Sequence, residues 1–429
     1  MSRTIECICL FALLSVVGLR PLIAETYDSA GLAMTSVLPG IEDPTPATTL
    51  IIDGVIMLAA LGWLVARWCS DDRSYRWSGI EWGAIVIVVA AIASCIFAGN
   101  KRLAINGAVD WLCCVLLAIV LAQLLRERWQ LQLALCVILA SAGAQAVECF
   151  HQVLYSFPET EAMYQANRDA IWQNQGVALD SPEVELFEAR MRSHEASGYL
   201  THSNVAGAYL VTCGLVALGL ALSRLRGGAD SLSRLQALPA LAVSAIILGA
   251  GVLTHSRGAL SAGAVAMVLW ILRARFGGVI ARHSKAAFRW AWLAVALGGM
   301  AVVGHGLWHG SLPGRSLDFR WKYWTASAGM FADRPLAGVG SGNFGRHYLQ
   351  YKTIESPEEV KNPHNFLVSA ATDWGVGGLV GMVMMLVGAS RGVARRGNRL
   401  DGLPGAGALG SEGGVRRGRF YGWGALIAA

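Results

Sequence analysis

Apolar runs of about twenty residues recur along the chain and alternate with shorter polar stretches, and a run of this length crosses the hydrocarbon core of a bilayer as a helix. The pattern predicts membrane spans near residues 4–23, 49–68, 79–98, 103–125, 131–155, 203–223, 237–253, 258–272, 287–308 and 366–390. A further span is predicted to begin near Phe420. The hydropathy pattern therefore predicts an all-α, polytopic transmembrane helix bundle of about 10–12 spans.

Composition supports the same class. The chain is 54% hydrophobic and only 15% charged, whereas soluble domains carry roughly 25% charged residues. Its nine cysteines lie in or beside the predicted spans, so the large loops contain no disulfide framework. The net charge of +6 does not indicate nucleic-acid binding, because the basic residues are confined to alternate loops.

This alternation predicts an orientation. Basic residues follow the second, fourth, sixth, eighth and tenth spans, as Arg67, Arg126, Arg224, Arg273 and Arg391 illustrate. The positive-inside rule then places these loops and the N-terminus in the cytoplasm. Loops 24–48, 156–202 and 309–365 are expected outside. The first apolar segment is interpreted as an uncleaved span, with a signal peptide as the alternative.

The predicted topology divides the chain into five parts. N-terminal spans occupy 1–155 and are followed by the first large extracytoplasmic loop, 156–202. Central spans occupy 203–308, and a second large extracytoplasmic loop, expected to be catalytic, occupies 309–365. The last part, 366–429, contains the C-terminal span or spans and a basic, Gly-rich cytoplasmic linker.

Several polar residues stand out at the predicted membrane boundaries. Ser181-Pro182 is typical of a helix start, and that helix would carry Arg192 towards the membrane. Asn204 opens the sixth span, either as its N-cap or as part of a polar shelf. Arg257 lies in a short outer turn, where it could anchor to lipid headgroups or bind a diphosphate through its planar fork.

Two aspartates lie inside apolar runs. Charged side chains in such positions are unfavourable and often functional. Asp53 and Asp110 are therefore candidates for a proton or ion path. The alternative is that each reaches water or a neighbouring helix from near the end of its span.

The stretch from Arg315 to Gly378 holds the densest candidate chemistry. A polar loop this large cannot lie in lipid, because its backbone groups would lack hydrogen-bond partners. Asn362-Pro363-His364-Asn365 runs directly into an apolar segment, so His364 is expected at the membrane surface, in the first turn of the span. It is interpreted as a general base, or alternatively as a helix-cap histidine. The glycines in 338–342 lack the Lys-Ser/Thr ending of a P-loop and are expected to form turns.

Taken together, these pieces resemble one family. Three motifs come first in the chain: Gly198-x-x-x-His202-Ser203-Asn204, Thr254-x-Ser256-Arg257-Gly258 and Arg320-x-x-x-Trp324. They are followed by Asp333-x-Pro335-Leu336-x-Gly338-Val339-Gly340-x-Gly342-x-Phe344, then by His364-Asn365, and last by Asp373-x-Gly375-x-x-Gly378. Over about residues 190–385 the chain resembles the O-antigen ligase and polymerase superfamily of the bacterial envelope. Leu367 stands one position closer to Asn365 than in that pattern, and Asp373 replaces the usual Glu.

The resemblance implies a helical bundle with a large extracytoplasmic loop of short helices in the bacterial inner membrane. It also implies transfer of a glycan from an undecaprenyl-diphosphate carrier to an acceptor hydroxyl, on a glycolipid such as lipid A–core or on another molecule. An O-antigen polymerase and a protein O-oligosaccharyltransferase remain alternatives within the superfamily. A lipid-linked-glycan transporter is the alternative from another class, although the sequence shows no paired broken spans.

The expected site follows from the matching positions. His364, Arg257 and Arg320 are the predicted catalytic residues. Arg192, Asn204, Asn343 and Asn365 are the predicted substrate-binding residues. No cofactor is expected and no metal ligand is assigned, because the outer histidines lack the short spacing of a zinc site.

Overall fold

The computed structural model describes residues 2–401 apart from 24–45, 71–73, 228–234, 236, 355, 357 and 358. These residues form helices joined by turns and loops, and none of them lies in a β-strand. Every span predicted up to residue 390 is a helix: α1 (Ser2–Leu19), α2 (Pro46–Trp68), α3 (Glu81–Phe97), α4 (Lys101–Leu124), α5 (Arg128–His151), α8 (Ser203–Gly227), α10 (Ala237–Leu253), α11 (Arg257–Arg282), α12 (Ser284–His309) and α15 (Phe366–Asp401). The segment near Phe420 lies outside the described residues.

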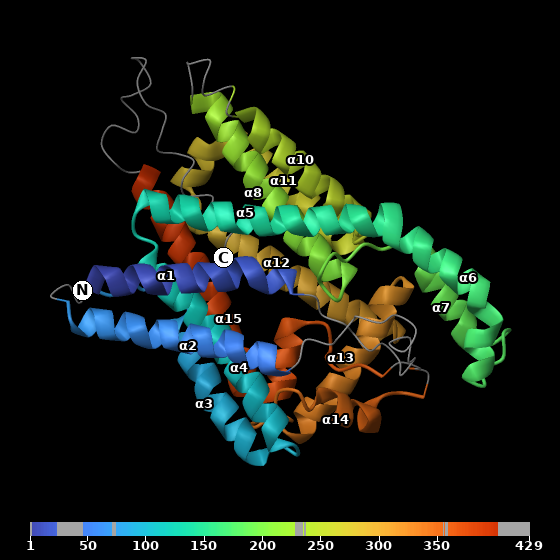
Figure 1. Cartoon of the computed structure of the whole chain (residues 1–429). Helices are drawn as coiled ribbons and strands as arrows, with labels where there is room; N and C mark the ends of the chain where they lie inside the picture. Colours follow the sequence, from blue (N-terminus) through green and yellow to red (C-terminus); the bar gives the residue numbers. More distant parts are fainter. Residues whose placement is uncertain are drawn as a thin grey trace.

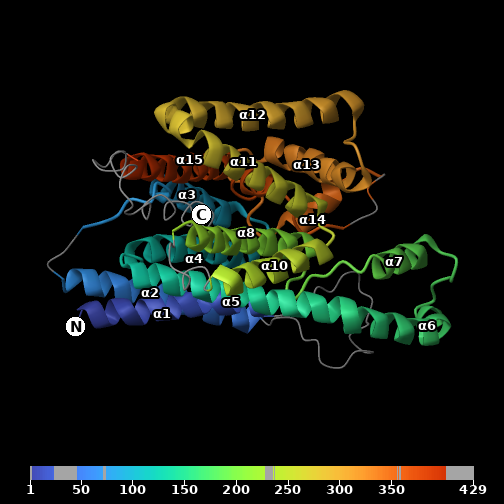
Figure 2. The ribbon, with the colours of Figure 1, turned by 90° about the horizontal axis from the view of Figure 1, so that it is seen from above.

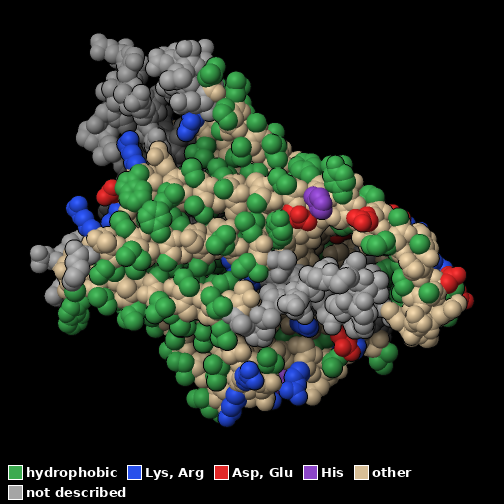
Figure 3. Space-filling view, in the orientation of Figure 1, with side chains coloured by type: hydrophobic (Ala, Val, Ile, Leu, Met, Phe, Trp, Pro, Cys, Tyr) green, Lys and Arg blue, Asp and Glu red, His purple; other side chains and the backbone are tan. Residues whose placement is uncertain are grey.

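Eight of these helices are long and apolar enough to cross a membrane, and α3 and α10 are shorter apolar helices. The prediction of a polytopic, all-α membrane protein is therefore confirmed. On the face that Figure 3 shows, hydrophobic side chains cover much of the bundle and charged side chains lie mainly towards its margins.

The remaining helices gather at one end of the bundle. These are α6 (Phe157–Asn174), α7 (Pro182–Arg192), α13 (Arg315–Asp333) and α14 (Phe344–Tyr351). Figures 1 and 2 both show them on the side opposite the N-terminus, which we call the loop end. Figure 2 also shows α12 along one edge of the bundle and α1 along the opposite edge.

Helix α5 continues into α6 through a π-helical segment, Gln152–Ser156. The continuous rod runs from Arg128 to Asn174 and is about 70 Å long at 1.5 Å per residue, far more than a bilayer core requires. At the π segment, the Gln152 side chain accepts hydrogen bonds from the backbone N–H groups of Ser197 and Gly198, both at 3.0 Å. The π segment thereby holds the loop that leads into α8.

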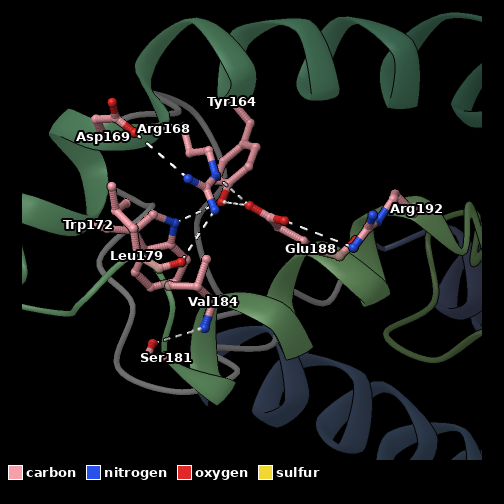
Figure 4. A network of polar contacts seen from close by, with 9 residues as sticks. All are labelled: Tyr164, Arg168, Asp169, Trp172, Leu179, Ser181, Val184, Glu188 and Arg192. Carbon is pink, nitrogen blue, oxygen red and sulfur yellow. Dashed lines mark hydrogen bonds and ion pairs between the residues drawn. The ribbon is translucent and has the colours of Figure 1, made fainter.

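Helices α6 and α7 form an arm beyond the bundle, held by the network in Figure 4. Arg168 Nε donates to Glu188 Oε1 at 2.6 Å, and Arg168, followed by Tyr164, holds the pKa of Glu188 below its usual range. Trp172 is fully buried and donates to the Tyr164 hydroxyl at 2.7 Å. The predicted start of α7 is confirmed, since Ser181 Oγ accepts from Val184 N at 3.4 Å.

Small residues allow the membrane helices to pack closely. Helix α15 lies against α3, and a Cβ added to Gly83 would lie 2.5 Å from the carbonyl oxygen of Gly381. Close backbone approach of this kind drives helix association in lipid, where apolar burial alone offers little. This close packing places α15, and the loop that precedes it, against α3.

The most unusual feature is a break in α15 at Trp374 and Gly375, where the backbone leaves the helical region. The Gly-rich loop enters this break: Val339 N donates to Thr372 O at 2.9 Å, and Gly340 N donates to Asp373 O at 3.0 Å. In return, Val376 N donates to Pro335 O at 2.7 Å. The loop therefore supplies the hydrogen bonds that the broken helix lacks.

The glycines of this loop form turns, as the sequence predicts. Gly338, Gly340 and Gly342 have φ values of 65°, 89° and 72°, in the region that glycine tolerates best. The loop also contacts α4, since a Cβ on Gly342 would lie 3.3 Å from Leu103 Cβ. Residues 335–343 thus join the loop end to α3, α4 and α15.

Substitution of Gly375 by alanine is expected to destabilise the contact between residues 335–343 and the break in α15. Gly375 has φ 64° and ψ −154°, a conformation that costs a residue with a side chain about 1–3 kcal/mol. An added Cβ would also lie 2.7 Å from the carbonyl carbon of Leu336. We expect Gly375→Ala to lower the thermal unfolding midpoint of the detergent-solubilised protein. Gly298→Ala is the control, because a Cβ there meets nothing within 4 Å. Equal midpoints for the two variants would contradict this account of the break.

Candidate active site

His364 lies at the loop end, immediately before α15. Its φ is 52°, a left-handed conformation that is uncommon for residues with side chains. Its backbone N–H donates to Asn362 Oδ1 at 2.9 Å. The carbonyl oxygen of buried Pro363 accepts from Trp324 Nε1 of α13 at 3.1 Å. The chain on both sides therefore fixes the backbone from which the exposed imidazole projects.

The predicted position of His364 within the first turn of the span is wrong. Helix α15 begins at Phe366, and Asn365 is its cap: Asn365 Oδ1 accepts from the backbone N–H groups of Leu367 at 3.0 Å and Val368 at 3.2 Å. Proline favours a first helical turn, but here the Asx-type cap decides where the helix starts. His364 thus lies outside the helix, and its backbone conformation is not helical.

Two aromatic side chains from other helices flank the His364 ring. The ring of His202, at the beginning of α8, lies 6.2 Å away at an interplanar angle of 83°. The ring of Tyr323, on α13, lies 5.9 Å away and is buried. Neither was predicted as a site residue. His202 could have been found, because it belongs to the Gly198-to-Asn204 motif, whereas Tyr323 carries no comparable sequence signal.

The beginning of α8 also contacts the turn between α10 and α11. Asn204 Oδ1 accepts from Ser256 Oγ at 2.8 Å, and a Cβ on Gly207 would lie 2.6 Å from Thr254 Oγ1. His202 and Asn204 are close in sequence. His202 lies beside His364, and Asn204 lies beside Ser256. This places Arg257, the first residue of α11, at the loop end with the histidines.

Arg257 and Arg320 both present a cationic group there. Arg257 is exposed, and Arg320 is half-buried on α13, one helical turn before Tyr323. Among the described residues, neither guanidinium has a hydrogen-bond or ion-pair partner. Arg257 also lies at a helix N-terminus, where backbone N–H groups and the helix dipole favour an anion. Each guanidinium is therefore suited to bind an anionic oxygen such as those of a diphosphate.

Arg192 ends α7, at the edge of the network in Figure 4. Its Nε donates to Glu188 O at 3.2 Å, and its side chain is 62% exposed. The next residue, Ser193, contacts His255 Nδ1 through its carbonyl oxygen at 3.1 Å. His255 has φ 51° and precedes Ser256 and Arg257. The arm therefore brings Arg192 next to the α10–α11 turn.

Asn343 occupies a different environment from the other predicted binding residues. It is fully buried, and its Oδ1 accepts from Asn100 N at 3.0 Å while its Nδ2 donates to Asn100 O at 3.1 Å. These bonds tie the Gly-rich loop to the beginning of α4. This placement favours a structural role for Asn343 over contact with a substrate.

The described residues contain no group of three or more His, Cys, Asp or Glu side chains arranged to hold a metal ion. The arrangement at the loop end consists instead of the exposed imidazole of His364 with its ring neighbours, the guanidinium groups of Arg257 and Arg320, and amide groups from Asn204 and Asn365. Such a set can accept a proton from a hydroxyl group and stabilise negative charge on a phosphate.

Part of this arrangement lies in a region that is similar to a known family. No curated protein matches the chain. Residues 242–383 match the O-antigen ligase family, and this region contains Arg257, Arg320, the Gly-rich loop and His364. Over these residues the chain is therefore similar to the O-antigen ligases, a family of membrane glycosyltransferase-like enzymes.

Proposed function

We propose that the chain is an inner-membrane glycosyltransferase of the ligase type. It moves a glycan from an undecaprenyl-diphosphate carrier to an acceptor hydroxyl, a lipid A–core sugar or another glycolipid, on the extracytoplasmic face. The proposal rests mainly on one observation: His364, with its ring neighbours, lies at the same end of the bundle as the guanidinium groups of Arg257 and Arg320, which have no polar partner among the described residues. The family match supports it.

The reaction needs few groups. The acceptor oxygen attacks the anomeric carbon of the donor sugar, and the bond from that carbon to the diphosphate oxygen breaks. His364 takes the proton of the attacking hydroxyl as general base. Arg257 and Arg320 stabilise the charge that develops on the departing lipid diphosphate. A single direct displacement inverts the configuration of the anomeric carbon, and the arginines supply the positive charge that a metal would otherwise provide.

Other side chains complete the proposed site. Arg192 extends the cationic surface beside the α10–α11 turn. Asn204 and Asn365 each use Oδ1 within the protein, which leaves their Nδ2 groups to donate to sugar or phosphate oxygens. We propose that the functional core spans about residues 190–385, because Arg192, His202 and Asn204 precede the matched region. The flanking divisions at 155, 202, 308 and 365 separate spans from loops.

The lipid part of the donor requires access from the membrane. Helices α11 and α12 carry many exposed apolar side chains, among them Val265, Leu269 and Val295. Since α11 begins at Arg257, its apolar surface leads towards the proposed diphosphate site. A carrier held in the bilayer could thus reach the arginines without leaving the lipid.

The orientation of the chain is open to a direct test. We expect a reporter fused after Leu312 or Tyr351 to be extracytoplasmic and one fused after Arg282 to be cytoplasmic, because the basic loops favour the cytoplasm. Paired alkaline phosphatase and fluorescent-protein fusions measure this. The opposite pattern would place His364 and Arg257 in the cytoplasm and exclude the proposed reaction.

Deletion of the gene in its host tests the function itself. For a ligase, we expect full-length glycan to accumulate on the lipid carrier while the final acceptor lacks it. Complementation with wild type should restore transfer, and His364→Ala serves as the inactive control. Single repeats on the final acceptor would indicate a polymerase, and loss of glycan from a protein would indicate an oligosaccharyltransferase. Reconstituted protein that moves lipid-linked glycan across a bilayer without forming a glycosidic bond would indicate a transporter.

A further inference from the structure

Two aspartates lie together in the membrane part of the bundle, on helices that carry none of the candidate active-site residues. Asp53 belongs to α2 and Asp110 to α4, and their side chains are within hydrogen-bonding reach of each other. Cys113, one helical turn beyond Asp110, confirms this register, because its Sγ lies 3.9 Å from the carbonyl oxygen of Asp53. Asp110 is about 13 Å from the start of α4 at 1.5 Å per residue, well within the span.

The environment of Asp53 is incompatible with an isolated charge. Asp53 is only 7% exposed, and while both carboxyl groups are ionised its buried Oδ2 has no hydrogen-bond donor among the described residues. A buried carboxylate without partners is strongly unfavourable. Two carboxylates in contact also repel each other, so one of such a pair retains its proton. A hydrogen bond between them requires that proton, because an ionised carboxylate can only accept.

The charged groups around the two aspartates indicate whether a proton or a metal ion binds between them. Arg20, in the short helix η1 (Arg20–Leu22) that follows α1, acts electrostatically on Asp110. Among the described residues, the other titratable groups that face the pair are the thiols of Cys113 and Cys114 on α4. Two carboxylates beside one guanidinium carry a single excess negative charge, which one proton balances. A metal ion would have to bind next to the Arg20 cation, which disfavours it.

We propose that Asp53 and Asp110 form a proton-binding site in the membrane, in which the two carboxyl groups share one proton beside Arg20. The site does not depend on the glycosyltransferase reaction. Asp110 lies on α4, one helical turn beyond Gly107. A Cβ added to Gly107 would lie 2.8 Å from Cβ of Ser341, in the Gly-rich loop. The same helix therefore carries the proton site and supports the Gly-rich loop.

Infrared spectroscopy of the full chain in lipid nanodiscs tests the proposal. A protonated carboxylic acid has a carbonyl stretching band that an ionised carboxylate lacks. We expect such a band at neutral pH, and we expect it to shift when the aspartates are labelled with ¹³C. Asp53→Asn and Asp110→Asn should each remove the whole of the shared-proton band, because the new amide donates the hydrogen bond and leaves the remaining carboxylate ionised beside Arg20.

The matched control is Asp318→Asn on α13, where the carboxylate forms an ion pair with Lys322, and this variant should keep the band. If wild type shows no label-sensitive band at neutral pH, the proposal fails without any substitution. A band that keeps its full intensity in both Asp53→Asn and Asp110→Asn arises from another aspartate and also overturns it. Loss of the band on addition of Na⁺ at constant pH would identify a cation site instead and would equally refute it.

Discussion

A His364→Ala enzyme is expected to transfer glycan about a hundredfold or more slowly than wild type, while protein level and donor binding stay near normal. A positioned general base contributes about 10²–10⁴-fold to a rate, and His364 is the exposed imidazole between His202 and Tyr323. Because Asn365 caps α15, the substitution does not remove the helix start. Transfer from a purified lipid-linked donor to its acceptor measures the effect.

The left-handed backbone of His364 makes a second variant informative. Alanine at φ 52° costs roughly 1 kcal/mol, whereas asparagine tolerates this conformation and lacks a basic ring. His364→Asn should therefore lose as much activity as His364→Ala without loss of stability. His309→Ala, at the end of α12 that leads into α13, is the control and should transfer normally. Near-normal turnover by His364→Ala would mean that another group, or water, removes the proton.

Arg257→Lys is expected to lose most transfer activity although it keeps the positive charge. An ammonium group cannot reproduce the two parallel hydrogen bonds of a guanidinium to phosphate. Removal of one such electrostatic contact typically lowers the rate by about a hundredfold or more. Arg257 begins α11 beside the Ser256–Asn204 hydrogen bond, so its backbone is held while its side chain is exposed. The kcat/KM for the lipid diphosphate donor measures the loss.

Arg273→Lys provides the comparison on the same helix. Arg273 lies towards the opposite end of α11, where its Nη1 donates to Gly277 O at 3.4 Å, and its substitution should leave kcat/KM unchanged. Wild-type activity of Arg257→Lys, in a protein that folds normally, would indicate that Arg257 anchors lipid headgroups. In that case Arg320 and Arg192 would have to bind the diphosphate.

The sequence predicts the helices well because each depends on local information. The length of an apolar run determines whether it can span a membrane, so α1 to α5, α8, α10 to α12 and α15 appear where the hydropathy pattern places them. Ser181 predicts the start of α7 for a similar reason, since a cap acts on residues directly after it. Motif spacing also identified Arg257, Asn204 and His364 as residues of the loop end.

The contacts between distant segments could not be predicted in this way. Asn343 looks like an accessible polar residue in the sequence, yet it hydrogen-bonds the backbone of Asn100, 243 residues away. The break at Gly375 is equally hidden, because a single glycine in an apolar run is compatible with a continuous helix. Tyr323 became a neighbour of His364 only through the packing of α13 against the segment before α15.

The broken helix also bears on the transporter alternative. Broken helices in transporters expose backbone groups to a cavity that binds substrate. In this chain the backbone of Pro335, Val339 and Gly340 fills the break in α15. The break therefore serves to hold a loop in place.

The contact of residues 335–343 with the break in α15 has a consequence for biogenesis. Ser94 Oγ donates to the carbonyl oxygen of Asp373 at 2.8 Å, although the two residues are 279 positions apart. The ribosome completes α3 long before it makes α15, and the hydrogen bonds of the Gly-rich loop with Thr372, Asp373 and Val376 cannot form until those residues have been made. Residues 335–343 can thus take their final position only after the first part of α15 has been synthesised, so the loop is made before the helix that holds it.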